Sequence, residues 1–176
     1  MKKLGLLLLL LISVNACKKI DKLTQFDLHF DTETTIPAGI PINTPYNIPT
    51  AEIPLETSDV YENNNTAKEL VEQALLKELK LTVTDPYNGN FNFLKDMEIY
   101  LSTDELPEIK IAWIYNHPND NKNNIQLITT DKDLQAYIKS DKIKTRVKTT
   151  IDEVLTKDYT VKIDFTFFID AKILGI

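Results

Sequence analysis

The alternation of apolar and polar side chains near the end of the chain does most to limit what this sequence can fold into. Residues 143–151 place an apolar side chain or a threonine at every second position, and residues 161–173 do the same over a longer stretch. A period of two is that of a β-strand with one buried face. We expect two long strands joined as a hairpin through the loop 152–158. In the register that matches the two patterns, Arg146 opposes Asp164 on the outer face.

The same period occurs in shorter segments earlier in the chain. We expect further strands at residues 25–32, 77–83, 97–101, 109–115 and 125–129. The segment 109–115 is nearly apolar, which predicts a central position in a sheet.

A proline-rich stretch separates the first two of these segments. Prolines occur at positions 37, 41, 45, 49 and 54, and an isoleucine precedes several of them. Proline has no backbone donor and holds its predecessor in extended geometry. We expect this stretch to run along a sheet edge with its isoleucines in the core. The alternative is a proline-rich ligand for a partner domain.

Two short segments have helical signals. Thr66 and Glu69 have the spacing of a capping box, and the apolar residues from Ala67 to Leu75 fall on one helical face. A second small helix is expected after Thr130, with Leu134, Tyr137 and Ile138 facing inward. The sequence therefore predicts a mainly β chain, with one β-sandwich domain over residues 25–176. The sandwich is expected to be immunoglobulin-like or jelly-roll-like, with one or two short helices.

Composition excludes several classes of function. The chain carries a formal net charge of −6, which argues against nucleic-acid binding. Beyond the N-terminal segment the glycines are Gly39, Gly89 and Gly175, so no glycine-rich phosphate loop can form. Cys17 is the one cysteine, so internal disulfides and thiolate metal clusters are excluded.

The N-terminal segment has the features of a secretory signal. Lys2 and Lys3 precede an apolar run, Leu4–Ile12, that is too short to span a membrane. Cys17 follows a small residue, Ala16, and this arrangement resembles the lipobox of bacterial lipoproteins. The resemblance implies that residues 1–16 are removed and that Cys17 is acylated. The alternative is a conventional secretory cut after Ala16, which leaves Cys17 as a free thiol.

The resemblance also implies a location. Residues 17–24 would be a lipid-anchored tether, and Lys18 stands where aspartate retains lipoproteins at the inner membrane of Gram-negative bacteria. We therefore expect an outer-membrane lipoprotein. The periplasmic side is preferred to the cell surface, because Asp21 is the one acidic residue near the anchor. The order of elements is similar to that of small, uncharacterised envelope lipoproteins with immunoglobulin-like sandwiches.

The best candidate surface feature is a basic stripe. Its members project from one face of the expected strand 143–151: Lys142, Lys144, Arg146 and Lys148. This stripe could contact the phosphates of lipopolysaccharide, an acidic glycan or an acidic patch on a partner. The alternative is structural, because lysines protect sheet edges and could pair with Asp164 or Asp170 across the hairpin.

Other chemistry-bearing residues are interpreted as structural. His29 lies between Asp27 and Asp31 on one strand face, but spacings of about 7 Å are too wide for a compact metal site. His117 has no nucleophile or helper base in its loop. The run Asn119–Asn121 lacks the glycine and glutamate of a calcium loop.

Two further groups are interpreted in the same way. The acidic residues Asp104, Glu105 and Glu108 are expected to be exposed charge rather than a glycosidase pair. Trp113 and Tyr115 are expected in the core and at its edge.

The sequence thus predicts no enzyme and no cofactor. The first hypothesis is a structural or assembly subunit of the outer membrane. It would be anchored through acylated Cys17 and bind an envelope protein partner. The alternative is an accessory lipoprotein that binds a glycan or lipid ligand through aromatic side chains of the loop Tyr87–Phe93. No nucleic-acid partner is expected.

Overall fold

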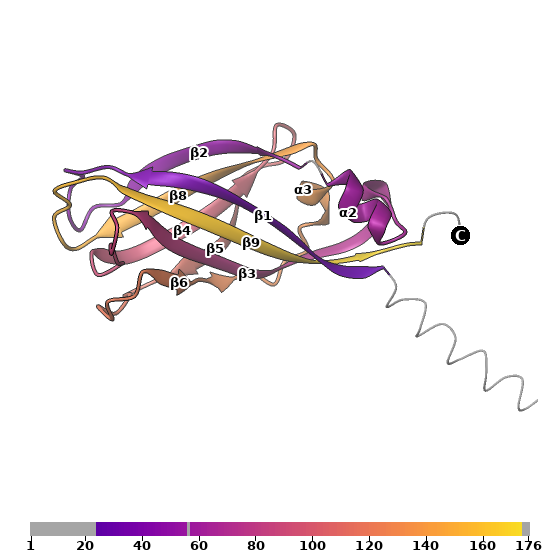
Figure 1. Ribbon diagram of the computed structural model, residues 1–176. Helices are drawn as coiled ribbons and strands as arrows, with labels where there is room; N and C mark the ends of the chain where they lie inside the picture. The colour runs from indigo at the N-terminus through magenta and orange to yellow at the C-terminus, as the bar shows by residue number, and fades with distance from the viewer. Residues whose placement is uncertain (1–23, 56, 174–176) are drawn as a thin grey trace, which may run out of the picture.

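The computed structural model describes residues 24–55 and 57–173, so Cys17 lies outside the described residues. Within that part, two antiparallel sheets pack face to face (Figure 1). The four-stranded sheet has the order β1 (Gln25–Ile36), β9 (Tyr159–Ala171), β3 (Val71–Asp85) and β6 (Asn124–Gln126). The five-stranded sheet has the order β2 (Tyr46–Pro54), β8 (Lys142–Ile151), β4 (Leu94–Ser102), β5 (Ile109–Ile114) and β7 (Ile128–Thr129). The predicted β-sandwich is confirmed.

The strand order is that of a jelly roll. The connections β1–β2, β3–β4, β5–β6 and β8–β9 each cross from one sheet to the other, while the first and last strands are neighbours. This arrangement matches the jelly-roll alternative rather than the immunoglobulin order.

The predicted hairpin between the last two strands is wrong. Both strands alternate as expected, but β8 pairs with β2 and β4, whereas β9 pairs with β1 and β3. Arg146 therefore has Tyr100 and Pro49 as its cross-strand neighbours, and Asp164 has Asp31 and Lys80. Alternation determines which face of a strand is buried, but it carries no information on which strand lies beside it.

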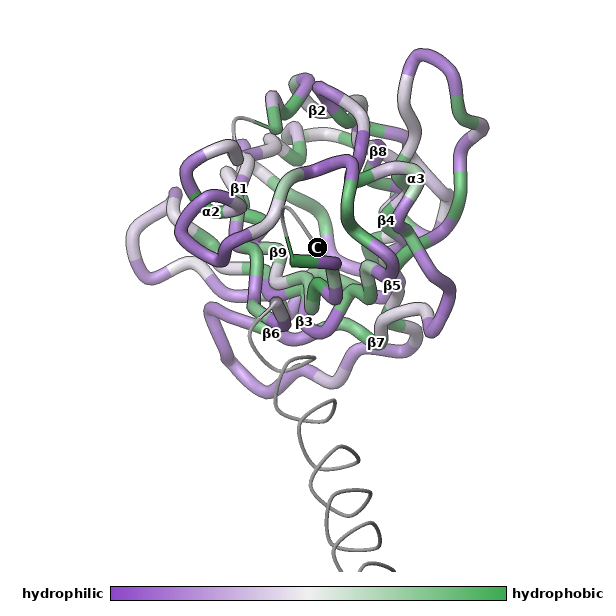
Figure 2. The backbone as a smooth tube through the Cα atoms, turned by 90° about the vertical axis from the view of Figure 1, so that its right-hand side faces the viewer, coloured by the Kyte–Doolittle hydropathy of each residue, from purple (hydrophilic) through white to green (hydrophobic). Residues whose placement is uncertain are grey.

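The core lies between the two sheets. From β9, Phe165 and Phe167 point inward, and Phe30 of β1 stacks on them at centroid distances of 5.0 and 5.4 Å. Ile99 and Val147 reach the same core from the five-stranded sheet and are fully buried. Figure 2 views the sandwich from the end that carries the C-terminus, with polar loops around a more apolar interior.

The prediction of an α-helix after Thr66 is wrong. Only Lys68–Leu70 forms a 3₁₀ turn, and β3 begins at Val71. The Thr66 hydroxyl donates instead to the carbonyl of Lys172 at 2.6 Å. Pairing of β3 with the long strand β9 overrides the local helical signal, because it buries a continuous apolar face.

Short helices occur at two other places. The helix α2 (Ser58–Asn63) was not expected from the sequence. The second predicted helix is confirmed as α3 (Gln135–Ile138), with Leu134 and Ile138 buried. Its N-cap is Leu134, so the prediction that Thr130 caps this helix is wrong.

The predictions for the sheet edges have mixed outcomes. The proline-rich stretch does supply an edge strand, β2, with Ile48 and Ile53 buried. The nearly apolar β5 is not central, because beyond it lies only the two-residue strand β7. Its apolar pattern arises because Ile111 and Ala112 are both buried at a bulge in β5, where Ile111 has no cross-strand partner on β4.

The sandwich has two distinct ends (Figure 1). The helix end carries α2, α3, the start of β1 and the end of β9. The loop end consists of four connections between the sheets: residues 37–45, 86–93, 115–123 and 152–158. Because the strands that they join are neighbours, these connections lie side by side across the sandwich. Hydrogen bonds join them directly, for example from Gly39 N to Leu155 O and from Phe91 N to Lys122 O, both at 3.0 Å.

Candidate functional site

The basic stripe lies on the outer face of the five-stranded sheet, and each of its members has a carboxylate partner. Lys142 and Lys144 share Glu52 and Asp104, with nitrogen–oxygen distances from 2.5 to 3.3 Å. Arg146 donates two hydrogen bonds to Glu108, at 2.6 and 2.8 Å.

The partners predicted for the stripe, Asp164 and Asp170, are wrong because β9 belongs to the other sheet. The acidic residues Asp104 and Glu108 are exposed, as predicted, and both are paired with basic side chains of the stripe. The lysine ammonium groups lower the pKa of Asp104, and Arg146 lowers that of Glu108.

Glu98 of β4 is the centre of a hydrogen-bond network that the sequence did not reveal. One carboxylate oxygen accepts from Tyr115 at 2.5 Å and from Lys110 at 3.1 Å. The other accepts from Lys148 at 2.9 Å and from Tyr100 at 3.0 Å. Burial raises the pKa of Glu98, but these four donors together outweigh it and bring the pKa to about 2.

Aromatic rings surround this network on the outer face. The Lys110 ammonium lies 5.1 Å from the ring centroid of Trp113, and the Arg146 guanidinium lies 4.1 Å from that of Tyr100. Trp113 is half-buried and opposite Glu98, so its predicted place in the core is wrong. The bulge in β5 at Ile111 places Trp113 and Lys110 on the same outer face.

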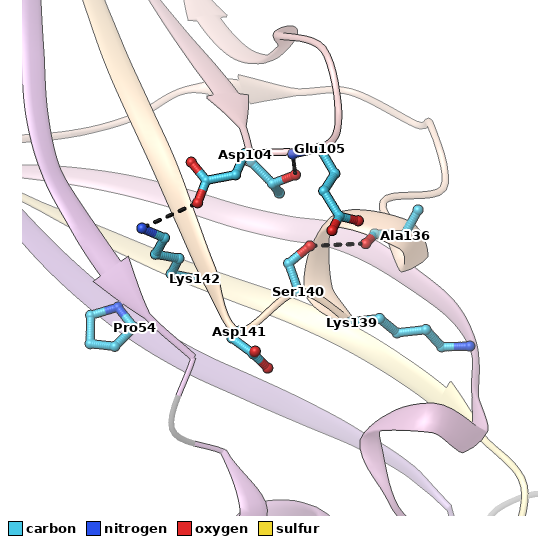
Figure 3. Close-up of a pocket in the computed structure, with 9 residues that line it drawn as sticks. Pro54, Asp104, Glu105, Ala136, Lys139, Ser140, Asp141 and Lys142 are labelled. Atoms are coloured by element: carbon cyan, nitrogen blue, oxygen red, sulfur yellow. Dashed lines mark hydrogen bonds and ion pairs between the residues drawn. The ribbon is translucent and has the colours of Figure 1, made fainter.

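A polar cleft of about 590 Å³ opens at the helix end, where the loop after β4 faces the start of β8 (Figure 3). Glu105 and Asp104 lie on one side of it, and Ser140 and Lys142 on the other. The Ser140 hydroxyl donates to the carbonyl of Ala136 at 3.5 Å, within its own helical turn. The cleft thus contains ion-paired side chains and the hydroxyl of Ser140. That hydroxyl is oriented by a backbone carbonyl of α3 and not by a side chain that could act as a general base.

His117 is the one buried titratable side chain of the loop end within the described residues. Its side chain is 3% exposed, and neither ring nitrogen has a hydrogen-bond partner. Nε2 lies 4.0 Å from Asp120, and Phe91 contacts the ring edge-on. Burial lowers the pKa of His117, Asp120 opposes that effect, and Lys122 adds to it.

We expect His117 to make stability depend on pH. The folded protein disfavours the imidazolium, so the contribution of His117 is complete above the ordinary pKa of 6.5. It is lost as the pH falls below that value towards the lowered folded pKa. Replacement His117→Phe should reduce the drop in urea midpoint between pH 7 and pH 5. The exposed His29→Gln variant should retain the wild-type drop, and identical pH profiles for all three proteins would contradict this expectation.

The remaining histidine belongs to β1, on the other sheet. His29 lies exposed on the four-stranded sheet, where Nδ1 is 3.1 Å from the Thr166 hydroxyl. Its neighbour Asp27 pairs with Lys77 at 2.7 Å. Among residues 24–55 and 57–173, no group of three acidic, histidine or cysteine side chains is placed to hold a metal ion.

The asparagine-rich loop at residues 115–123 is held in place by a neighbouring loop. Asn92 donates to the Asn121 side chain at 2.8 Å and accepts from the Asn121 backbone at 3.0 Å. Asp120 pairs with Lys122 at 2.7 Å. The Asp120 and Asn121 side chains, which stand in the run that resembles a calcium loop, thus bond to Lys122 and Asn92.

Only one of the three aromatic residues proposed as ligand contacts is accessible. Phe91 and Phe93 are buried, whereas Tyr87 is 90% exposed. The sequence of this short loop could not reveal the difference in exposure, because Phe91 packs against His117, which belongs to another loop.

The exposed large apolar side chains gather at the loop end. Within the described residues they are Ile42, Tyr46, Tyr87, Tyr115, Val154 and, apart from the rest on β7, Ile128. Tyr46 and Tyr115 lie at the loop end of β2 and β5, with β8 and β4 between these two strands, and are 37% and 46% exposed. Each of the four connections at the loop end, or the strand end beside it, thus carries an exposed large apolar side chain.

Comparisons with known proteins add little. No family model and no curated protein matches the chain. Among solved structures, a chain from Desmodium yellow mottle tymovirus is similar at 10% identity, with a TM-score of 0.24. It covers 84% of this chain and 89% of its own length. In the part of the chain that the structure describes, no helix is both long and apolar enough to cross a membrane.

Proposed function

We propose that this protein is a non-enzymatic, lipid-anchored subunit of a bacterial cell envelope. It is held at the outer membrane through acylated Cys17, on the periplasmic side, and acts as a structural or assembly partner of another envelope protein. The observation that carries the proposal is the lipobox-like segment that ends at Cys17, eight residues before the first strand begins at Gln25.

The fold supports this proposal through the positions of its two ends. Eight extended residues span at most about 28 Å, so the helix end would stay close to the membrane surface. β9 has 13 residues and so is about 43 Å long, which would carry the loop end well away from the membrane. The exposed tyrosines of the loop end would then face a partner rather than the lipid.

We expect the replacement Cys17→Ser to release the protein from the membrane. Each buried methylene of an acyl chain contributes about 0.8 kcal/mol to membrane binding, so several chains anchor the protein almost irreversibly. The wild type should fractionate with outer membranes, and its intact mass should exceed that of the cleaved polypeptide by the acyl groups. The serine variant should be soluble. A wild-type protein of unmodified mass would contradict the proposal and support cleavage that leaves a free thiol.

The partner is tested separately. A tagged wild-type protein, cross-linked in intact cells and purified from gently solubilised outer membranes, should carry a stoichiometric envelope protein. Recovery of the acylated protein by itself would contradict the assembly role and favour the ligand-binding alternative, which the exposed tyrosines of the loop end support.

A further inference from the structure

Within the described residues the two sheets end in four edge strands, and β1 differs from the other three. The edge strand β2 contains Pro49 and Pro54 and has a register shift between Pro49 and Glu52. The edge strands β6 and β7 have only three and two residues. β1 has 12 residues and no proline, and it pairs with β9 without any register shift (Figure 1). Prolines, bulges and short length are devices that keep further strands from pairing with an edge, and β1 has none of these three.

The backbone of β1 is hydrogen-bonded on one side only. In an antiparallel pair, alternate residues direct their N–H and C=O groups away from the neighbouring strand. Among residues 24–55 and 57–173, the backbone of β1 bonds to β9 and to no other segment. The opposite edge of the same sheet is closed even where β3 extends beyond β6. There the Ala74 carbonyl accepts from Leu134 N at 2.8 Å, and Ala74 N donates to Asp133 at 3.0 Å.

Two aromatic rings on the inner face of β1 remain partly exposed at this edge. Phe26 contacts the Tyr61 ring edge-on at a centroid distance of 5.7 Å, and Phe30 stacks on Phe165 and Phe167. Both rings pack against the core but are only half-buried. A strand added beside β1 would place its own inward side chains next to these rings and remove their exposed area from water. Apolar side chains are therefore favoured at the inward positions of such a strand.

The outer face of β1 carries negative charge and no lysine or arginine. Its acidic residues are Asp27, Asp31 and Glu33. Asp31 stands opposite Asp164 on β9, and Lys162 pairs with Asp164 at 2.6 Å and with Asp31 at 3.6 Å. Glu33 is exposed and makes no ion pair within the described part of the chain. Like charges on neighbouring strands repel each other, so this face disfavours a second copy of β1 and favours a strand with basic residues.

We propose that β1 binds an extended segment of a partner protein as an additional strand, and that basic and apolar residues alternate in this segment. Its basic side chains would lie beside Asp31 and Glu33 on the outer face, and its apolar side chains would cover Phe26 and Phe30. Backbone hydrogen bonds provide affinity in this mode of binding, and the alternate side chains provide specificity. The inference goes beyond the proposed function, because strand addition requires neither acylation of Cys17 nor the exposed tyrosines of the loop end.

Amide hydrogen exchange, followed by NMR on the full chain in mild detergent, first tests whether the edge is free. Every second amide of β1 should exchange at least tenfold faster than its neighbours, because it faces away from β9. The amides of β9 should all exchange slowly, since β9 lies between β1 and β3. Uniformly slow exchange along β1 would overturn the inference. Slow exchange that develops only at high protein concentration would assign the edge to a second copy of this chain, and it would also overturn the inference.

The probe for the partner segment is a short synthetic peptide in which lysine and valine alternate. At saturation it should slow the fast amides of β1 at least tenfold. A peptide that alternates glutamate and valine has the wrong charge, and a peptide with its lysines and valines in separate blocks cannot present one kind of residue on each face. Both should leave these amides fast. If the alternating lysine peptide binds but the amides of β1 stay fast, it binds elsewhere and the inference is overturned.

Two double variants test the charge of the edge. Asp31→Lys with Glu33→Lys should weaken binding of the lysine peptide at least tenfold and allow the glutamate peptide to bind. Wild-type affinity in this variant would contradict the inference. Glu105→Lys with Asp131→Lys makes the same change in net charge at exposed positions outside β1, and it should bind like the wild type.

Two further variants keep this test decisive. If the lysine substitutions in β1 prevent folding, Asp31→Asn with Glu33→Gln keeps the size of both side chains and should weaken binding of the lysine peptide in the same direction. Unchanged affinity in that variant would overturn the inference. Cys17→Ser should bind the peptide like the wild type, whether or not it leaves the membrane. A failure of strand addition is thereby distinguished from a failure of the proposed anchor.

Discussion

Replacement of Phe167 by alanine is expected to destabilise the protein by about 3 to 5 kcal/mol, the usual cost of deleting a large aromatic side chain from a core. Phe167 is fully buried on the inner face of β9, and Phe30 of the neighbouring strand stacks on it. The side chain lies between the two sheets, so its loss leaves a cavity that neither sheet can close. The melting temperature should fall by about 10 °C or more, measured by circular dichroism.

The adjacent residue provides the matched control. Phe168 points to the outer face of the same strand and is half-buried beside Leu75. Phe168→Ala removes the same atoms but should cost about 1 kcal/mol, because only part of the ring leaves water on folding. Equal destabilisation by both variants would contradict the inward direction of Phe167 and therefore the register of β9.

Replacement of Glu98 by glutamine is expected to produce the second largest loss, about 2 to 3 kcal/mol near neutral pH. The carboxylate is only 13% exposed and accepts hydrogen bonds from Lys110, Lys148, Tyr100 and Tyr115. An amide of the same size keeps the shape but loses the charge, and it leaves two ammonium groups without their counter-ion. The free energy of unfolding in urea would measure the loss.

The pH dependence of that loss identifies its electrostatic origin. The pKa of Glu98 is lowered from 4.5 to about 2 in the folded protein, so its contribution is complete above about pH 4.5. It declines as the pH falls and is lost near pH 2. The difference in unfolding free energy between wild type and Glu98→Gln should therefore be constant from pH 5 to 7 and decrease below. Glu105→Gln, at an exposed loop position, should match the wild type. A difference that is independent of pH would indicate a packing effect instead.

The functional surfaces of this protein were only partly predictable from its sequence. The basic stripe was visible, because Lys142, Lys144, Arg146 and Lys148 are neighbours on one strand. The carboxylates that pair with them were not visible, because Glu52, Glu98, Asp104 and Glu108 belong to other segments. The loop end was not visible either, since its exposed tyrosines come from three separate parts of the chain.

The sequence by itself determined the local character of this protein. Alternation in β1, β8 and β9 established the strands and their buried faces, and the prolines placed β2 at an edge. These properties depend on residues two positions apart, or on the backbone chemistry of one residue.

Only the tertiary structure decided which strands are neighbours. It separated β8 from β9 and converted the expected helix after Thr66 into the start of β3. It also brought four donors to Glu98 and gathered the four loops at one end. The reason is that pairing is selected by the burial of whole faces against each other. That free energy belongs to contacts between distant segments and leaves no period in the local sequence.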